Sequence, residues 1–165
     1  MSTMKVRIRD VRAEEIPLVR ALNNAAVPHV NALPLAEMHR FIHASAYFRV
    51  AVRSRTLLGF LVGFRPGAQY ESENYLWFQA RYDDFIYIDR IVVAPEAAGQ
   101  GVAKALYADL GNVMSGSVAA MTCEVNIKPE NPVSMEMHRK LGFREIGQQE
   151  TGGGEKRVSL LRKEL

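Results

Sequence analysis

The chain has one cysteine, Cys123, among its 165 residues, and it has no uninterrupted apolar stretch of the length that a membrane span needs. A single cysteine excludes an internal disulfide and a zinc site built from a cysteine cluster. The segment Met1 to Lys5 leads at once into charged, alternating residues, so it has no apolar core of a secretory signal. We therefore expect a cytoplasmic protein without a membrane partner, with Cys123 as a small hydrophobe in a strand.

The chain also has little excess of positive over negative charge. Lys and Arg number 21 and Asp and Glu 18, which gives a net charge of +3. The basic residues are scattered and are not interleaved with aromatic residues, which disfavours a nucleic-acid groove and favours a small anionic ligand. His39 and His43 stand four residues apart, but Arg40 occupies the place of the glutamate in a metalloprotease helix. The sequence thus predicts no metal site and no nucleic-acid partner.

The chain is 48% hydrophobic, and segments with the period of strands alternate with segments with the period of helices. This predicts one α/β domain over residues 1–165, a mixed sheet of about seven strands with about four helices on its faces. A polar break at residues 53–56 and a glycine run at 152–154 predict hairpins. Residues 65–84 are expected to form a long aromatic loop that either packs on its own sheet or contacts a substrate. The expected strands are 5–12, 47–52, 57–64, 86–93, 118–125, 143–149 and 156–161, and the expected helices are 13–26, 33–44, 102–114 and 133–141.

The most informative stretch is residues 85–114, which reads as a strand, a glycine turn and an amphipathic helix. Pro95 cannot donate to a sheet, so the strand should end just before it. Gly99 and Gly101 allow a tight turn. A helix that begins there presents unpaired N–H groups and a positive dipole end, which is a site for an anion. This pattern predicts a cofactor that carries phosphate.

Residues 93–106 read VAPEAAGQGVAKAL and resemble the acetyl-CoA motif of the GNAT superfamily of N-acetyltransferases. Residues 131–143 read NPVSMEMHRKLGF and are similar to the second signature of that family, an Asn-led helix that ends in Leu-Gly-Phe. The order of the expected elements also fits this fold. The resemblance implies a GNAT-type domain in which two parallel central strands splay apart. It further implies direct transfer of an acetyl group from acetyl-CoA to a primary amine within a ternary complex.

The resemblance also implies how acetyl-CoA is held. The pantetheine arm would pair with the backbone of the first central strand, as an added strand does, and the pyrophosphate would lie on amides of the glycine turn. Ala98 stands where the family usually has Arg or Gln, and Lys104 is then a source of positive charge. Asn131 would cap its helix and contact the pantetheine arm. The implied cofactor contacts are Ile91, Val92, Val93, Gly99, Gln100, Gly101, Val102, Ala103, Lys104 and Asn131.

Acetyl transfer needs a base for the amine and a proton for the leaving thiolate. Glu124 is the first candidate base, because some family members keep a catalytic glutamate there; the alternative is a surface carboxylate. Asp89 competes with it, since it interrupts an apolar strand and is either functional or paired with Arg90 or a loop residue. His138 stands where many members have a tyrosine near the thiol. It is either the general acid or a packed histidine.

The acceptor amine is left open by the sequence, although the first two helices and residues 70–82 would shape its pocket. A second class of function is a non-catalytic acyl-CoA-binding sensor, because Ala98 and His138 depart from the family pattern. Many members of the family dimerise, so the resemblance also suggests a homodimer.

Overall fold

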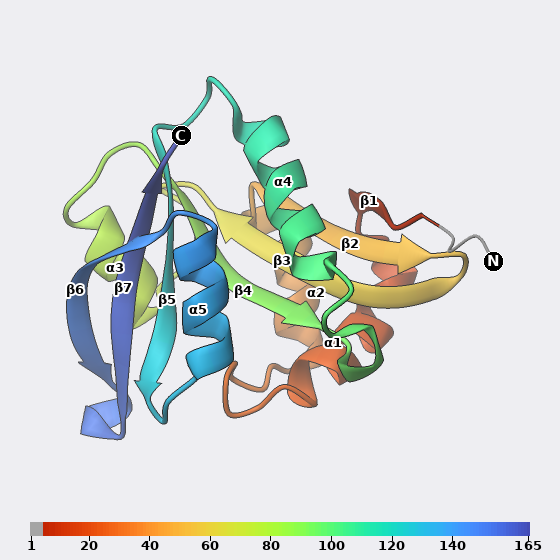
Figure 1. Ribbon diagram of the computed structural model, residues 1–165, viewed down its shortest axis with the longest axis horizontal. Helices are drawn as coiled ribbons and strands as arrows, with labels where there is room; N and C mark the ends of the chain where they lie inside the picture. The colour runs from red at the N-terminus through yellow and green to blue at the C-terminus, as the bar shows by residue number, and fades with distance from the viewer. Residues whose placement is uncertain (1–4) are drawn as a thin grey trace. The chain divides into compact units, whose positions relative to one another are not determined.

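The computed structural model describes residues 5–165 (Figure 1). The seven strands in this range form a mixed sheet in the order β1-β2-β3-β4-β5-β7-β6, which confirms the predicted fold class. None of the helices in residues 5–165 is long and apolar enough to cross a membrane. The expectation about a secretory signal falls mainly on residues 1–4, outside the described range.

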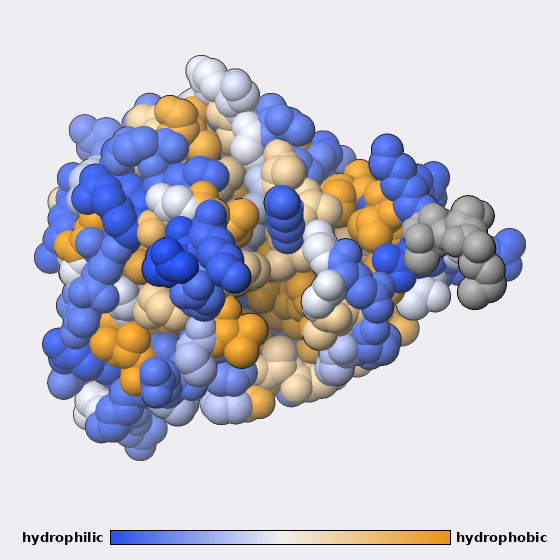
Figure 2. All heavy atoms as spheres, in the orientation of Figure 1, coloured by the Kyte–Doolittle hydropathy of each residue, from blue (hydrophilic) through white to orange (hydrophobic). Residues whose placement is uncertain are grey.

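By its internal contacts the chain forms two compact units, and the expectation of one domain over residues 1–165 stays a prediction. The first unit comprises Met1–Gly63 and Arg90–Met114, and the second comprises Phe64–Asp89 and Ser115–Leu165. Hydrophilic residues cover much of the face drawn in Figure 2, with hydrophobic residues between them. The most exposed large apolar side chains, Val133 and Leu18, lie on different helices.

In the first unit, β1 pairs with β2 and β2 pairs with β3, both antiparallel, so the predicted hairpin is confirmed. Its turn places Ser54 at a φ of 56°, in the left-handed region. The first helix was expected to begin at Ala13, but it begins at Ile16 after a 3-10 turn, because Pro17 has no N–H to donate and suits a first turn. The elements are β1 (Arg7–Asp10), η1 (Ala13–Glu15), α1 (Ile16–Asn24), α2 (Leu35–Ala44), β2 (Tyr47–Arg53), β3 (Thr56–Phe64), β4 (Ile86–Val93), whose second half belongs here, η2 (Pro95–Ala97) and α4 (Val102–Met114).

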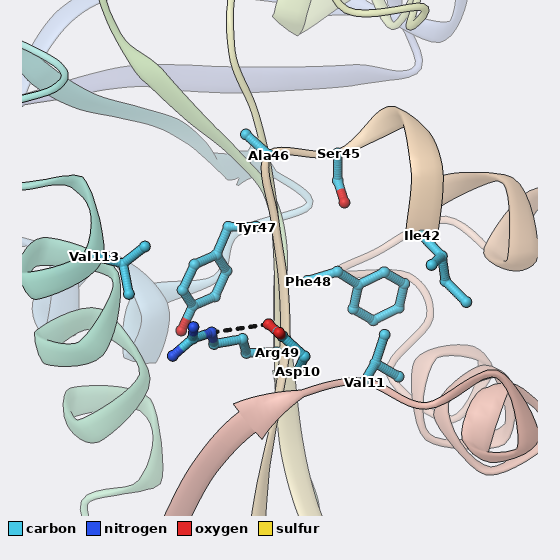
Figure 3. A pocket seen from close by; sticks show the side chains of 9 residues that line it. All are labelled: Asp10, Val11, Ile42, Ser45, Ala46, Tyr47, Phe48, Arg49 and Val113. Carbon is cyan, nitrogen blue, oxygen red and sulfur yellow. Dashed lines mark hydrogen bonds and ion pairs between the residues drawn. The ribbon is translucent and has the colours of Figure 1, made fainter.

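Strand β2 is covered on both faces, and its side chains alternate between them (Figure 3). Phe48 points to the side of Ile42, whereas Tyr47 and Arg49 point toward α4. The Tyr47 hydroxyl donates to Asp109 Oδ2 at 2.8 Å, and Arg49 Nη1 lies 3.1 Å from the same oxygen. Burial and the Asp109 carboxylate raise the pKa of Tyr47, so the phenol remains a donor. This network fixes α4 on β2.

In the second unit, β4 pairs in parallel with β5 at Ile86–Met121 and Tyr87–Thr122, and β7 pairs antiparallel with both β5 and β6. Helices α3 and α5 lie on opposite faces of this part of the sheet (Figure 1). The predicted glycine hairpin is confirmed between β6 and β7. The elements are α3 (Glu73–Gln79), the first half of β4, β5 (Ala120–Lys128), α5 (Pro132–Lys140), β6 (Arg144–Thr151), η3 (Gly152–Gly154) and β7 (Lys156–Glu164).

The segment 65–84 is not a loop throughout, because residues 73–79 form α3. The Ser72 side chain caps the helix by accepting the N–H of Tyr75 at 3.1 Å. Tyr75 and Phe78 are fully buried, and their rings lie 5.6 and 5.8 Å from that of Tyr87. The prediction missed α3 because the helix has only seven residues and buries only these two of them. So few positions do not establish a helical period in the sequence. Of the two roles expected for the aromatic residues, packing on their own sheet is confirmed for this pair.

Candidate functional site

The first unit contains the second half of the predicted strand, the glycine turn and the helix. Strand β4 ends at Val93, and the N–H of Ala94 donates to the carbonyl of Leu58 at 2.8 Å. Gly99 and Gly101 have φ values of 76° and 81°, a region that residues with a Cβ rarely adopt. A Cβ built on either glycine meets no atom within 4 Å, so the turn faces open space. The first N–H groups of α4 follow directly, and they have no acceptor within the helix.

The side chain of Gln100 ties this turn to the end of β2. Its amide oxygen accepts from Arg53 Nη1 at 2.8 Å, and its amide nitrogen donates to the carbonyl of Glu96 at 3.0 Å. From the sequence we predict Lys104 as the source of positive charge at the turn. That prediction does not include Arg53, which lies 47 residues before Gln100. No local pattern marks Arg53, because only the position of the hairpin brings it to the turn.

Gly59 is a second residue that the sequence reading missed. A Cβ at Gly59 would lie 2.6 Å from the carbonyl oxygen of Val92 and 3.3 Å from Val102 Cγ1. Strand β3 can therefore approach the end of β4 and the start of α4 only because this position has no side chain. A glycine inside an otherwise apolar strand was the signal that could have found it.

In the second unit, the candidate base Glu124 is held by Tyr87. The Tyr87 ring is fully buried, and its hydroxyl oxygen lies 2.8 Å from both carboxylate oxygens of Glu124. Burial, then the charges of Glu124 and Asp89, raises the pKa of Tyr87 well above its usual value. Tyr87 therefore keeps its proton and acts as the donor in this contact.

Asp89, the competing base, accepts a short hydrogen bond from the hydroxyl of Tyr70. One partner of Asp89 is thus a loop residue, which is one of the two kinds of partner that the sequence predicted. The Tyr70 ring stacks on Phe64 with ring centres 4.2 Å apart. Asp89 and Glu124 both lie close enough along the paired strands to act on Tyr87, and their charges add to the rise in its pKa.

The strand register explains this grouping. Tyr87 is paired with Thr122, and Asp89 and Glu124 lie two residues further along the two parallel strands. Residues two apart share a face of a strand, so these four side chains lie on one face of the sheet. That face is the one that α3 covers, since the ring of Tyr75 lies 5.6 Å from that of Tyr87.

Asn131 begins α5 as predicted. Its side-chain oxygen accepts the N–H of Ser134 at 3.2 Å, which confirms the predicted N-cap. The helix then places His138 in a buried position, with 2% of its surface exposed. Nδ1 of His138 lies 2.7 Å from the carbonyl oxygen of Ser134, and the ring meets Phe143 edge-on with centres 5.2 Å apart.

Burial lowers the pKa of His138 below its usual value, although the bond to Ser134 opposes this effect. The imidazole is therefore neutral at pH 7. Because a carbonyl oxygen only accepts, the proton lies on Nδ1, and Nε2 is left as an acceptor. Of the two roles that the sequence left open, this geometry favours packing over direct proton donation.

The lowered pKa of His138 predicts a dependence of stability on pH. The unfolded state takes up the proton more readily than the folded state, so stability should fall as the pH drops below about 6.5. We expect the His138→Gln variant to lose less unfolding free energy than the wild type between pH 7.5 and 5.5, as measured by urea denaturation. The exposed His29 provides the control, His29→Gln. Equal losses in the wild type and in His138→Gln would contradict the assignment.

A cavity of about 380 Å³ lies elsewhere in the first unit (Figure 3). None of the predicted site residues lines it, and among residues 5–165 no group of three or more His, Cys, Asp or Glu is placed to hold a metal ion. The cavity is lined by Asp10, Val11, Ile42, Ser45, Ala46, Tyr47, Phe48, Arg49 and Val113.

Comparison with known proteins identifies the family. The model of the acetyltransferase (GNAT) family matches residues 17–143, more than half of the chain. The chain belongs to the GNAT acetyltransferase family. The matched range of this GNAT protein contains the glycine turn, Asp89, Glu124 and His138. A search of curated protein sequences gives no significant match.

Solved structures agree with the GNAT fold. Ard1 from Thermoplasma volcanium has a TM-score of 0.77 at 15% identity, with 97% of each chain covered. NAA60 from Arabidopsis thaliana, in complex with a bisubstrate analogue, has a TM-score of 0.77 at 18% identity, covering 97% of this chain and 98% of that one. YncA from Salmonella typhimurium, a putative acetyltransferase with acetyl-CoA, has a TM-score of 0.73 at 15% identity, covering 98% and 94%. At these identities the likeness shows the fold alone.

Proposed function

We propose that this GNAT protein transfers the acetyl group of acetyl-CoA directly to a primary amine within a ternary complex. The observation that carries the proposal is the turn after β4, where two glycines with positive φ face open space at the start of α4. It lies inside the range that matches the acetyltransferase family. When bound, acetyl-CoA supplies an activated acetyl thioester, and the residues of the chain bind it and move protons.

The turn fits a diphosphate group. Backbone N–H groups from Gly99 to Lys104 would donate to the phosphate oxygens, and the positive end of the α4 dipole adds to their attraction. The first turn of α4 carries Lys104 and no acidic residue that would oppose an anion. The backbone of Ile91, Val92 and Val93 would pair with the pantetheine arm, and Asn131 would contact that arm beyond its capping role.

Ala98 stands where the family usually has Arg or Gln, and we propose that Arg53 supplies the positive charge that is missing there. It reaches the turn through Gln100, so its guanidinium is held beside the amides that would receive the diphosphate. We expect Arg53→Ala to raise the KM for acetyl-CoA about fivefold and to leave kcat nearly unchanged, because binding is lost equally in the ground and transition states.

Arg55→Ala is the matched control for this prediction, since Arg55 is an exposed arginine of the same hairpin turn. Steady-state kinetics at fixed amine concentration would compare the two variants. An equal change in KM for both variants would show that Arg53 contributes only general charge.

Glu124 is the base that we propose for the amine. It lies on β5 beside a buried donor, in a group of side chains that also contains Asp89. A base is needed because a free primary amine is mostly protonated near pH 7. Asp89 is the second candidate, held by Tyr70. His138 stays a candidate for returning a proton to the thiolate, but its Nε2 would first have to gain a proton.

The assay for this proposal measures thiol release from acetyl-CoA with a panel of small amines, amino acids and peptides with free N-termini. Amine-dependent release, together with mass spectrometry of an acetylated product, would support the proposed reaction. Tight acetyl-CoA binding without turnover on any amine would favour the alternative, a non-catalytic acyl-CoA sensor.

A further inference from the structure

We propose that Tyr87 is the positioning residue of Glu124, which it holds in place both before and after Glu124 takes a proton from the acceptor amine. This inference rests on the proposed function, because it gives Tyr87 a part in that reaction. Neither sequence signature contains Tyr87, which lies before the glycine turn on β4.

The contact between the two side chains has an unusual symmetry. The Tyr87 oxygen lies at the same distance, 2.8 Å, from both oxygens of Glu124. A phenol has one proton to donate, so in the carboxylate form the two oxygens share it. If Glu124 is protonated, one of its oxygens carries the new proton and the other still accepts from the Tyr87 hydroxyl. The same positions of the heavy atoms thus keep the Tyr87 hydroxyl paired in both protonation states of Glu124.

The reaction would use this property in one balanced step. Glu124 takes one proton from the ammonium form of the acceptor, which leaves a neutral amine with its lone pair. The carboxylate becomes a carboxylic acid, and Tyr87 keeps its own proton throughout. No heavy atom of the pair has to move, so the geometry of the base is kept during proton transfer.

The surroundings support a positioning role for Tyr87. Its ring is fully buried and contacts Tyr75 and Phe78 of α3, so its hydroxyl has a fixed place. The charged and titratable groups around this face come from several elements. They include Asp89 on β4, Tyr70 in the segment before α3, Tyr75 on α3 and Arg162 on β7. Arg162 is paired with Thr122 on one side and with Arg144 of β6 on the other, and both arginines contact Glu164.

The test compares Tyr87→Phe with the wild type. Phe retains the ring contacts and removes only the hydroxyl, so the carboxylate of Glu124 loses a buried donor and becomes harder to keep charged. We expect kcat at pH 7 to fall about tenfold and the acidic limb of the kcat/KM profile to move up by about one pH unit. The KM for acetyl-CoA should not change.

Thr122→Val is the matched control. Thr122 lies on the same face, and its hydroxyl is buried without a hydrogen-bond partner in the described part of the chain. Replacing this hydroxyl by a methyl group should leave the pH profile unchanged. Thermal unfolding of both variants would show whether either substitution disturbs the fold.

A measurement without turnover separates this inference from the proposed function. In protein labelled with ¹³C-glutamate, the carboxyl signal of Glu124, assigned by its loss in Glu124→Gln, can be titrated in each variant. Titration at higher pH in Tyr87→Phe and not in Thr122→Val would support the positioning role. An unchanged Glu124 titration or an unchanged acidic limb in Tyr87→Phe would overturn it.

The turnover assay tests the proposed function separately. If the wild type releases no thiol with any amine, the proposed function fails. The role of Tyr87 in that reaction then fails as well, whatever the titration shows.

Discussion

Replacing Glu124 by Gln is expected to lower kcat at pH 7 by about 10²- to 10³-fold, because the amide cannot take a proton from the amine and general-base catalysis is worth about that much. Gln keeps the size of the side chain and can still accept from Tyr87, whose hydroxyl lies 2.8 Å away, so the local packing should persist. Thiol release at saturating acetyl-CoA and amine measures the effect. The lost rate should return in part at high pH, where free amine becomes abundant.

Two further variants make the Glu124 experiment decisive. Asp89→Asn tests the competing base, since Asp89 is held by Tyr70 in the same group. Glu136→Gln is the control, because Glu136 is an exposed carboxylate of α5 that binds Arg139. We expect Glu136→Gln to keep the wild-type rate. A full rate in Glu124→Gln with a large loss in Asp89→Asn would assign the base to Asp89.

The elements that the sequence predicted well carry local signals. Strand β4 stops before Pro95, two glycines with positive φ make the turn, and α4 begins at Val102. Asn131 caps α5 as its place before Pro132 indicated. In each case the signal is backbone chemistry within a few residues of the feature, and tertiary contacts do not have to override it.

The contacts that define the chemistry of the site could not be predicted in this way. Tyr70 meets Asp89 across 19 residues, Tyr87 meets Glu124 across 37, and Arg53 meets Gln100 across 47. The Tyr87 and Glu124 pair depends on strand register, since a shift of one residue would turn Glu124 to the other face. The resemblance to the family pointed to Glu124, but not to the tyrosine that holds it.

The helix α3 shows a third situation, in which a local signal existed but was too weak. Ser72 is a favoured N-cap residue with Glu73 in the first turn, and Tyr75 and Phe78 stand three residues apart, on one face of a helix. Seven residues with two buried positions give little periodicity, and the flanking polar residues resemble a loop. The aromatic packing against Phe85 and Tyr87 decides the conformation, and that packing is tertiary.

Replacing Gly59 by Ala is expected to lower the free energy of unfolding by about 3 kcal/mol, the upper range for an overpacked core. The new methyl group would lie 2.6 Å from the backbone oxygen of Val92, and a backbone atom of a paired strand cannot move aside cheaply. For a chain of this length the melting temperature should fall by about 10 °C. The same shift would displace the end of β4, so the KM for acetyl-CoA should rise. Urea denaturation and steady-state kinetics measure the two effects.

Gly147→Ala separates this clash from the general effect of replacing a strand glycine. At Gly147 the new methyl group would lie 2.9 Å from the ring of Trp77, a half-buried side chain that can shift. Ala is otherwise favoured over Gly in a strand by about 0.5–1 kcal/mol, so the net effect at Gly147 should be small and the KM unchanged. Equal destabilisation by the two variants would mean that the approach of β3 to Val92 does not set the geometry of the proposed cofactor turn. A large loss at Gly59 alone would show that one missing side chain keeps that turn in place.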